Sequence, residues 1–272
     1  MATRRTEVHI LTEYSPFSMG FVLITPNNRA IIIDGGRAEE LPNVAAHVGN
    51  RPVAAWILTH PHGDHAWCFQ HALNNNHPLI AATERVICNF HSSSFYEAHG
   101  GKGEASVALA FEMSKEKIAD RLMTPVTGDV FEIDGLKFEV LFHRDEKYTK
   151  NCVNDSSLVF RVTGTRQNVL FLGDLGPIAG RDLLAKHGSY LRSDVVQMAH
   201  HGHMCVEKDV YEAIDPRACI WCAQSWLYNE GLELPYAHAP EMHGTGLTRQ
   251  WMKEIGVTEH YVTKDGDQVI MI

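Results

Sequence analysis

Four side chains of the kind that bind metal ions occur within six consecutive residues of this sequence. His60, His62, Asp64 and His65 form the pattern HxHxDH. Imidazole and carboxylate groups suit Zn²⁺ and Mn²⁺, whereas Ca²⁺ and Mg²⁺ prefer shells made of oxygen alone. The four groups are too close in sequence for one ordinary tetrahedral site, but a tight loop can divide them between two adjacent ions. The motif therefore predicts a centre of one or two divalent ions that activates water for hydrolysis.

The residues before this motif indicate how it is presented. Residues 53–60, VAAWILTH, form a continuous apolar run that ends at His60 and is typical of a buried strand. A histidine-rich surface turn would not need a buried strand before it. We therefore interpret the motif as a site at the end of a strand rather than as a solvated turn.

Strand-like and helix-like segments alternate along the rest of the chain. The predicted strands and hairpins cover residues 8–14, 20–25, 30–34, 53–60, 130–142, 157–174, 193–199, 218–222 and 260–272. The predicted helices cover residues 37–48, 106–122, 181–191 and 247–256, and residues 92–104 are predicted to be a loop. Apolar strands with helices between them indicate sheets covered by helices. We expect one α/β domain over residues 1–272, with two similar halves at roughly 1–125 and 126–272.

Composition limits the classes of function. The 272 residues include 17 histidines and carry a formal net charge of −9. Proteins that hold long nucleic acid usually present a basic face, so we expect a small-molecule substrate instead. The chain has neither a long apolar run nor a signal-peptide pattern, so we expect no membrane span and a cytoplasmic location. The oligomeric state is left open.

The cysteines predict neither a disulfide framework nor a metal site. The six cysteines are scattered, which suits a reducing compartment. Cys219 and Cys222 form a CxxC, but they lie in an apolar run that reads as a strand. Positions i and i+3 of a strand point to opposite faces, so we expect two buried thiols that do not share an ion.

The HxHxDH motif after a strand resembles the central motif of metallo-β-lactamase-fold hydrolases. Three further elements resemble the other motifs of that family and follow in the same order: Asp34 in IIIDGG, Asp174 in FLGDL, and His200 with His201 in QMAHHG. The resemblance covers nearly the whole chain. It implies a four-layer αβ/βα sandwich, with the metal ions in the cleft between the two halves.

The same resemblance implies roles for the ligands. His60 and His62 would hold one ion, and Asp64 and His65 would hold the other. Asp174 would bridge the two ions. Asp64 is also a catalytic candidate, since either it or Asp174 would orient the attacking water.

The remaining family motifs imply one further ligand and one supporting residue. The family position is a histidine before glycine, which favours His201 as the last ligand. His200 would then face the cleft as an acid or as a contact to the developing oxyanion. Asp34 would support the metal loop without binding metal.

One segment departs from the family pattern. Most members supply another histidine to the first ion, but this chain has the sequence NDSS at residues 154–157. NDSSLVF, followed by LGD and AHHG, is similar to the hydrolase domain of the DNA-uptake competence protein. PYAHAPE resembles another element of that branch and nominates His238 as a catalytic cleft residue. The first ion is then either weakly held or completed by Asp155, His143 or His238.

Other polar residues are weaker candidates. We expect His91 and His99 to lie in a solvent-facing loop, and Ser157 either to cap a turn or to line the site. The chain has no GxSxG or GxxxxGK[ST] motif, which disfavours a serine hydrolase and a nucleotide-phosphate loop.

These observations favour hydrolysis of a small phosphodiester or related ester. The alternatives are hydrolysis of a lactone, carboxylic ester or amide and, as less favoured readings, a nuclease or a metal sensor without catalysis. A diiron redox role would bring a carboxylate in place of one motif histidine and a flavin domain, and the sequence has neither.

Overall fold

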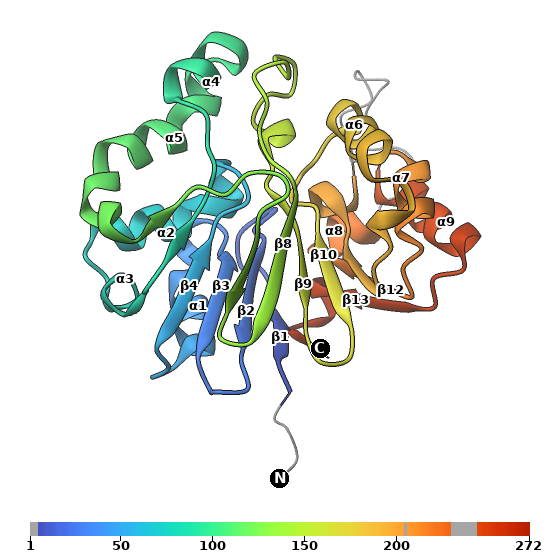
Figure 1. Cartoon of the computed structure of the whole chain (residues 1–272), viewed down its shortest axis with the longest axis horizontal. Coiled ribbons are helices and arrows are strands. Elements are labelled where there is room, and N and C mark those ends of the chain that lie inside the picture. Colours follow the sequence, from blue (N-terminus) through green and yellow to red (C-terminus); the bar gives the residue numbers. More distant parts are fainter. Residues whose placement is uncertain (1–4, 204–205, 230–243) are drawn as a thin grey trace.

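Two seven-stranded sheets face each other and carry helices on their outer sides (Figure 1). The computed structural model describes residues 5–203, 206–229 and 244–272. Both sheets contain parallel and antiparallel pairs. This arrangement confirms the predicted α/β sandwich of four layers.

The first sheet is built mainly from the N-terminal half of the chain. Its order is β14-β1-β2-β3-β4-β5-β6. Its strands are β1 (Glu7–Ile10), β2 (Gly20–Ile24), β3 (Ala30–Asp34), β4 (Val53–Ile57), β5 (Val86–Ile87), β6 (Leu122–Met123) and β14 (Gln268–Met271). The helices of this half are α1 (Leu41–Val48), α2 (Gly63–Asn74), α3 (Pro78–Ala82), α4 (Ser93–Gly100) and α5 (Lys102–Ser114).

The second sheet has the order β13-β12-β11-β10-β9-β8-β7. Its strands are β7 (Val130–Ile133), β8 (Leu136–Phe142), β9 (Val159–Thr163), β10 (Asn168–Phe171), β11 (Val195–Gln197), β12 (Ala218–Trp221) and β13 (Glu259–Val262). The helices that alternate with the later strands of this sheet are α6 (Pro177–His187), α7 (Lys208–Ile214), α8 (Ser225–Asn229) and α9 (Thr245–Ile255). None of the helices in the described parts of the chain combines the length and apolarity needed to span a bilayer.

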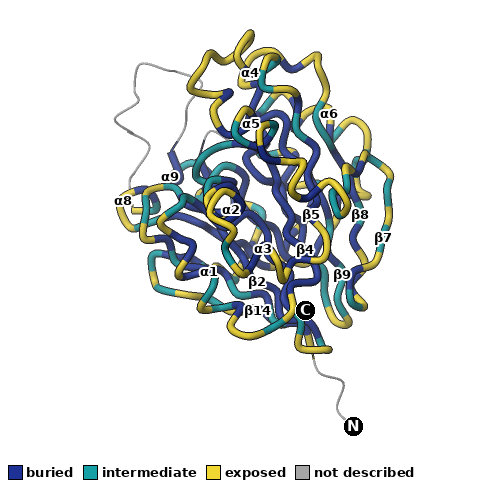
Figure 2. Tube along the Cα trace, turned by 90° about the vertical axis from the view of Figure 1, so that its left-hand side faces the viewer, coloured by how far each residue is buried: buried dark blue, intermediate teal, exposed yellow. Residues whose placement is uncertain are grey.

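The core consists of one apolar layer between the sheets and one on each outer face. Phe21 and Phe171, from opposite sheets, meet between them with ring centroids 5.1 Å apart. Trp56 lies in the outer layer beneath the helices of the first sheet. Cys222 belongs to the inner layer and Cys219 to the outer layer of the second sheet, which confirms that the CxxC thiols point to opposite faces. Figure 2 shows the buried strands surrounded by the more exposed helices.

The C-terminal segment is not the hairpin that its alternating pattern predicts. β13 pairs in parallel with β12 in the second sheet, whereas β14 pairs antiparallel with β1 in the first sheet. A short 3-10 turn, Thr263–Asp265, separates the two strands. Alternation identifies a strand but not its partner, so the prediction of two strands was sound and their pairing was wrong.

The segment predicted as a loop at residues 92–104 forms two helices. α4 begins after Ser92, whose Oγ accepts a hydrogen bond from the backbone N–H of Phe95 at 3.2 Å. α5 begins after Gly101 and ends at Ser114, where the predicted helix of residues 106–122 changes to a 3-10 helix. The predicted helix of residues 181–191 begins earlier, at Pro177, because proline is favoured in the first turn.

Candidate metal centre

The HxHxDH motif lies in the connection between β4 and α2. β4 ends at Ile57, His60 and His62 lie in the loop, and α2 begins at Gly63. Asp64 and His65 therefore occupy the first turn of this helix. His60 and His65 are completely buried, which directs their rings into the molecule instead of into solvent.

Asp34, at the end of β3, anchors this loop. Its carboxylate accepts hydrogen bonds from the backbone N–H of Thr59 at 2.7 Å and from the Thr59 hydroxyl at 2.9 Å. It also accepts a hydrogen bond from Nδ1–H of His65 at 2.8 Å. The bond fixes the tautomer of His65 and leaves Nε2 as the atom that faces the site. Burial raises the pKa of Asp34, while its contact with His65 acts in the opposite direction.

The two histidines after β11 have unusual backbone geometry. His200 and His201 have φ angles of 49° and 58°, in the left-handed region. Nδ1–H of the buried His201 donates to the carbonyl oxygen of Cys222 at 2.9 Å, which leaves Nε2 free to face the site. Burial lowers the pKa of His201 to about 4, so this ring is neutral at pH 7 and in the form that binds metal.

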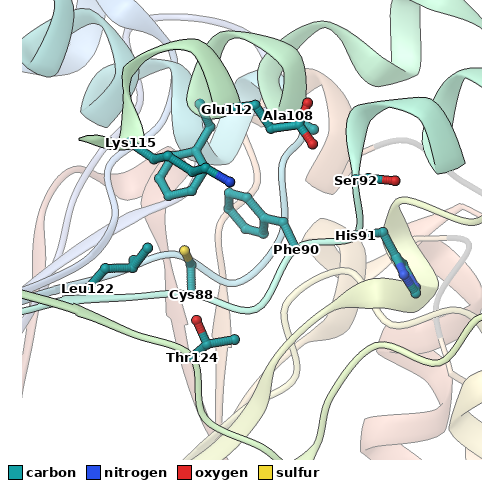
Figure 3. A pocket seen from close by; sticks show the side chains of 10 residues that line it. Cys88, Phe90, His91, Ser92, Ala108, Glu112, Lys115, Leu122 and Thr124 are labelled. Carbon is teal, nitrogen blue, oxygen red and sulfur yellow. The ribbon is translucent and has the colours of Figure 1, made fainter. Parts of the chain in front are cut away.

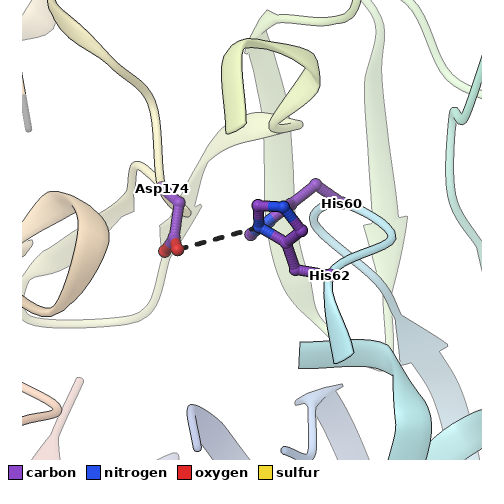
Figure 4. Close-up of side chains that lie close together, drawn as sticks. All are labelled: His60, His62 and Asp174. Atoms are coloured by element: carbon purple, nitrogen blue, oxygen red, sulfur yellow. Dashed lines mark hydrogen bonds and ion pairs between the residues drawn. The ribbon is translucent and has the colours of Figure 1, made fainter. Parts of the chain in front are cut away.

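Six potential ligand side chains form two groups in the described part of the chain. His60, His62 and Asp174 make one group, and Asp64, His65 and His201 make the other. Within each group the potential ligand atoms lie within 4.8 Å of one another. Figure 4 shows Asp174, from the connection after β10, facing the two histidines of the first group.

Asp174, a member of the first group, also lies close to the histidines of the second group. Its Oδ2 is 3.7 Å from Nε2 of His60 and 3.7 Å from Nε2 of His201. Its Oδ1 is 3.1 Å from Nε2 of His65. Nε2 of His200, which is 15% exposed, also lies 3.7 Å from Oδ2 of Asp174. A carboxylate at this position can bind an ion held by either group.

The donor set fits a bound cation. Nε2 of His65, Nε2 of His201 and Oδ1 of Asp174 are buried and have no hydrogen-bond partner among the described residues. The carboxylate of Asp174 lies 3.1 Å from Nε2 of His65 and 3.7 Å from Nε2 of His201. Lone pairs that face one another this closely are stabilised by a positive charge between them, either a proton or a metal ion. Imidazole and carboxylate groups are the ligands that zinc and manganese use in proteins.

The ionisation of the buried groups reflects the same crowding of lone pairs. Burial alone would raise the pKa of Asp174, but the surrounding histidines, His65 first among them, hold it well below its usual range. Burial alone would lower the pKa of His65, but Asp174 and Asp34 raise it well above its usual range. Burial and the neighbouring His65 lower the pKa of His60.

The sequence model of the metallo-beta-lactamase superfamily matches residues 21–202, a span that holds both ligand groups. The chain belongs to the metallo-beta-lactamase superfamily. No curated protein sequence matches the chain. Family membership and the two ligand groups together support metal binding, without identifying the metal or the substrate.

Two solved structures share the metallo-beta-lactamase fold of the chain. The metallo-beta-lactamase fold protein YhfI from Bacillus subtilis is 11% identical, with a TM-score of 0.58 over 98% of this chain and 100% of that one. CmlA, a diiron beta-hydroxylase from Streptomyces venezuelae, is 11% identical, with a TM-score of 0.57 over 99% of this chain and 54% of that one. The chain thus spans about half the length of CmlA. At this level of identity the likeness shows the fold alone.

The segment that replaces the usual superfamily histidine is engaged in structural hydrogen bonds. Asp155 accepts a hydrogen bond from the backbone N–H of Gly176 at 2.9 Å, and burial raises its pKa to about 7. Ser157 Oγ accepts from the backbone N–H of Asp174 at 3.0 Å, so it supports a candidate ligand. His143 Nδ1 accepts from the backbone N–H of Thr127. None of these residues belongs to either ligand group in the described chain. His238, the other candidate, lies outside the described residues.

His91 is not the solvent-facing residue that the sequence predicts. It is 5% exposed, stacks on Phe95 with ring centroids 4.0 Å apart, and accepts a hydrogen bond at Nδ1 from Arg144 at 2.9 Å. Phe95 and Tyr96 of α4, the helix that follows Ser92, pack against its ring. His99, at the far end of the same helix, is exposed as expected.

Two further residues were not predicted as parts of the site. Gln197 accepts hydrogen bonds at Oε1 from the backbone N–H groups of Leu172 and Gly173, both at 2.9 Å, and so fixes the connection that carries Asp174. Glu104, from α5, accepts a hydrogen bond from Nε2–H of His62 at 2.6 Å. This hydrogen bond lowers the pKa of Glu104. Gln197 is the first residue of QMAHHG, but that motif does not indicate its role, and Glu104 belongs to no motif, so only the structure reveals these contacts.

A separate hollow lies beside α5. It has a volume of about 250 Å³, and Cys88, Phe90, Phe111 and Lys115 are among its lining residues (Figure 3). No residue of either ligand group lines it. The hollow is therefore distinct from the candidate metal centre.

Proposed function

We propose that the protein is a metal-dependent hydrolase that uses one or two zinc or manganese ions to cleave a small phosphodiester or related ester. The observation that carries the proposal is the pair of adjacent ligand groups that meet at Asp174, with buried lone pairs that lack partners in the described parts of the chain. Two adjacent ions suit in-line displacement at phosphorus, because they can stabilise both the attacking and the leaving oxygen.

The residues of the two groups would hold the ions. His60, His62 and Asp174 would bind one ion, and Asp64, His65 and His201 would bind the other, with Asp174 shared. When bound, such ions would lower the pKa of water at the site and stabilise developing negative charge.

Side chains of the protein would orient the attacking water and assist the leaving oxygen. Asp64, with 19% of its side chain exposed, would orient the attacking water. His200, the more exposed of the two adjacent histidines, would donate a proton to the leaving oxygen or contact the oxyanion. His238 is proposed for the same cleft on the similarity of PYAHAPE to the competence-protein branch.

The proposed substrate class rests on that branch and on charge. The NDSS segment and the AHHG motif resemble the competence-protein hydrolase domain, which favours phosphoric esters. The net charge of −9 favours a small phosphodiester over long nucleic acid, because a polyanion would be repelled.

The test is turnover by the metal-loaded protein on bis(p-nitrophenyl) phosphate and, in parallel, on simple lactones. We expect metal-dependent cleavage of the phosphodiester. We expect Asp64→Ala to lower kcat/KM by about 100-fold or more. The exposed Asp120 provides a matched control, since Asp120→Ala removes a carboxylate outside both groups. Faster cleavage of lactones than of the phosphodiester would contradict the proposed substrate class. Stoichiometric metal binding without turnover on any ester would contradict the proposal that the protein is a hydrolase.

A further inference from the structure

Glu104 makes a direct contact with a candidate metal ligand from outside both ligand groups. Its carboxylate lies 2.6 Å from Nε2 of His62. The other ring nitrogen of His62, Nδ1, lies 3.1 Å from Nε2 of His60, on the side where the first group gathers. The two nitrogens of His62 therefore face different partners: a carboxylate on one side and the ligand group on the other.

We propose that Glu104 is a positioning residue that fixes the tautomer and the ring orientation of His62, an inference that rests on the proposed metal site. An ionised carboxylate can only accept hydrogen bonds, so the proton of a neutral His62 resides on Nε2. Nδ1 then carries the lone pair that a metal ion requires. Without Glu104, the solvent-accessible ring of His62 could rotate or change tautomer, since 23% of its side chain is exposed.

The corner between α4 and α5 is shaped to direct Glu104 toward His62. Gly101 separates the two helices with a φ of +88°, a conformation that favours glycine. A Cβ atom at Gly100 would lie 2.8 Å from both Cβ and Cγ of Glu104. The side chain of Glu104 thus runs through space that any larger residue at position 100 would occupy. This glycine-rich segment, which reads as a flexible loop in the sequence, has a defined shape.

The helices that form this corner are themselves anchored. The backbone N–H of Ser93, at the start of α4, donates to the carboxylate of Glu112 in α5 at 2.9 Å. The hydroxyl of Tyr96 lies 2.8 Å from Oγ of Ser156, next to the serine that supports Asp174. Ala105 packs in the same small cluster as Tyr96. The α4–α5 pair therefore contacts His62 through Glu104. Through Tyr96 it also contacts the segment that carries Ser157, the residue that supports Asp174.

The first test is the tautomer of His62 in the metal-free, full-length protein, measured by long-range ¹H–¹⁵N NMR at alkaline pH. The His62 signals are assigned by their loss in His62→Ala. We expect the Nε2–H tautomer in the wild type and in Glu104→Gln, because the amide oxygen still accepts a hydrogen bond. We expect Glu104→Ala to lose this preference and the exposed control Glu97→Ala to keep it. An Nδ1–H tautomer in the wild type, or an unchanged tautomer in Glu104→Ala, would overturn the proposal.

The second test is zinc affinity by competition with a chromophoric chelator. We expect Glu104→Ala to weaken one bound ion by about 10- to 100-fold, Glu104→Gln to weaken it less, and Glu97→Ala to have no effect. Gly100→Ala, which displaces the carboxylate without removing it, should weaken the same ion. Equal affinity in Glu104→Ala and the wild type would contradict the inference. A wild-type chain that binds neither zinc nor manganese would contradict the proposed function instead, and the tautomer would still decide the role of Glu104.

Discussion

Each histidine of the two ligand groups has one ring nitrogen engaged by a group of the protein. Nδ1 of His60 lies 3.1 Å from the hydroxyl of Thr59, and Nδ1 of His65 is bonded to Asp34. His201 uses a backbone carbonyl and His62 uses a carboxylate. Such partners select the nitrogen that remains available to a metal. The sequence predicts the ligand types because the motif is local, and the family resemblance predicts the support from Asp34. It does not predict the partners of His62 and His201, which come from distant segments.

A buried carboxyl outside the ligand groups gives a pH-dependent prediction at the same scale. Glu13 is 8% exposed, and burial raises its pKa from 4.5 to about 7. Between these two values the folded state keeps a proton that the unfolded state releases, so stability falls as the pH rises through this window and stays lower above it. The shift corresponds to roughly 3 kcal/mol at one such group.

We therefore expect Glu13→Gln, which mimics the neutral form, to raise the free energy of unfolding relative to the wild type. The gain should be up to roughly 3 kcal/mol near about pH 8 and close to zero near about pH 4. Urea unfolding of the metal-free protein at the two pH values measures this difference. A gain that is the same at both values would show that the ionisation of Glu13 does not limit stability.

The sequence predicts helices and strands where their pattern is local, and it fails where contacts between distant segments determine the structure. The apolar runs predicted the strands that end at Asp34, before His60 and before Asp174, so the edge that carries the site could be placed. The pairing of β14 with β1 could not be predicted, because alternation does not identify a partner strand. α4 was missed because its residues are mostly exposed and lack a clear apolar stripe.

The turn after β3 gives a prediction at the scale of elements. Gly36 has a φ of +84°, and a Cβ there would lie 2.8 Å from Cγ of Glu40 and from Cβ of Ser18. Gly128 has a similar φ of +100°, but a Cβ there would meet nothing within 4 Å. We expect Gly128→Ala to cost about 1 kcal/mol through backbone strain alone. We expect Gly36→Ala to cost about 3 kcal/mol, because the turn must also shift.

Thermal or urea unfolding of the two glycine variants, side by side, measures the difference. The shifted turn carries Asp34, so Gly36→Ala should also weaken metal binding, whereas Gly128→Ala should not. Equal destabilisation by the two substitutions would mean that the turn after β3 accommodates a side chain and does not constrain Asp34.

At the scale of the whole molecule, the candidate centre joins the two sheets. His60, His62, Asp64 and His65 follow β4 of the first sheet, whereas Asp174 and His201 follow strands of the second sheet. Bound ions would therefore link the two halves of the sandwich. The order of the family motifs predicted this architecture. The substrate could not be predicted in the same way, because pockets are built by loops that vary between members of one fold.

The most direct test of a two-ion hydrolase is the amount and identity of metal per chain, measured by elemental analysis of protein purified without chelators. We predict about two equivalents of zinc or manganese in the wild type. We predict loss of about one equivalent in His62→Ala, since the second group keeps its own ligands. No bound metal in the wild type would contradict the metal centre itself. A single equivalent would restrict the proposal to a one-ion centre, and two equivalents of iron would contradict the hydrolytic zinc or manganese centre proposed here.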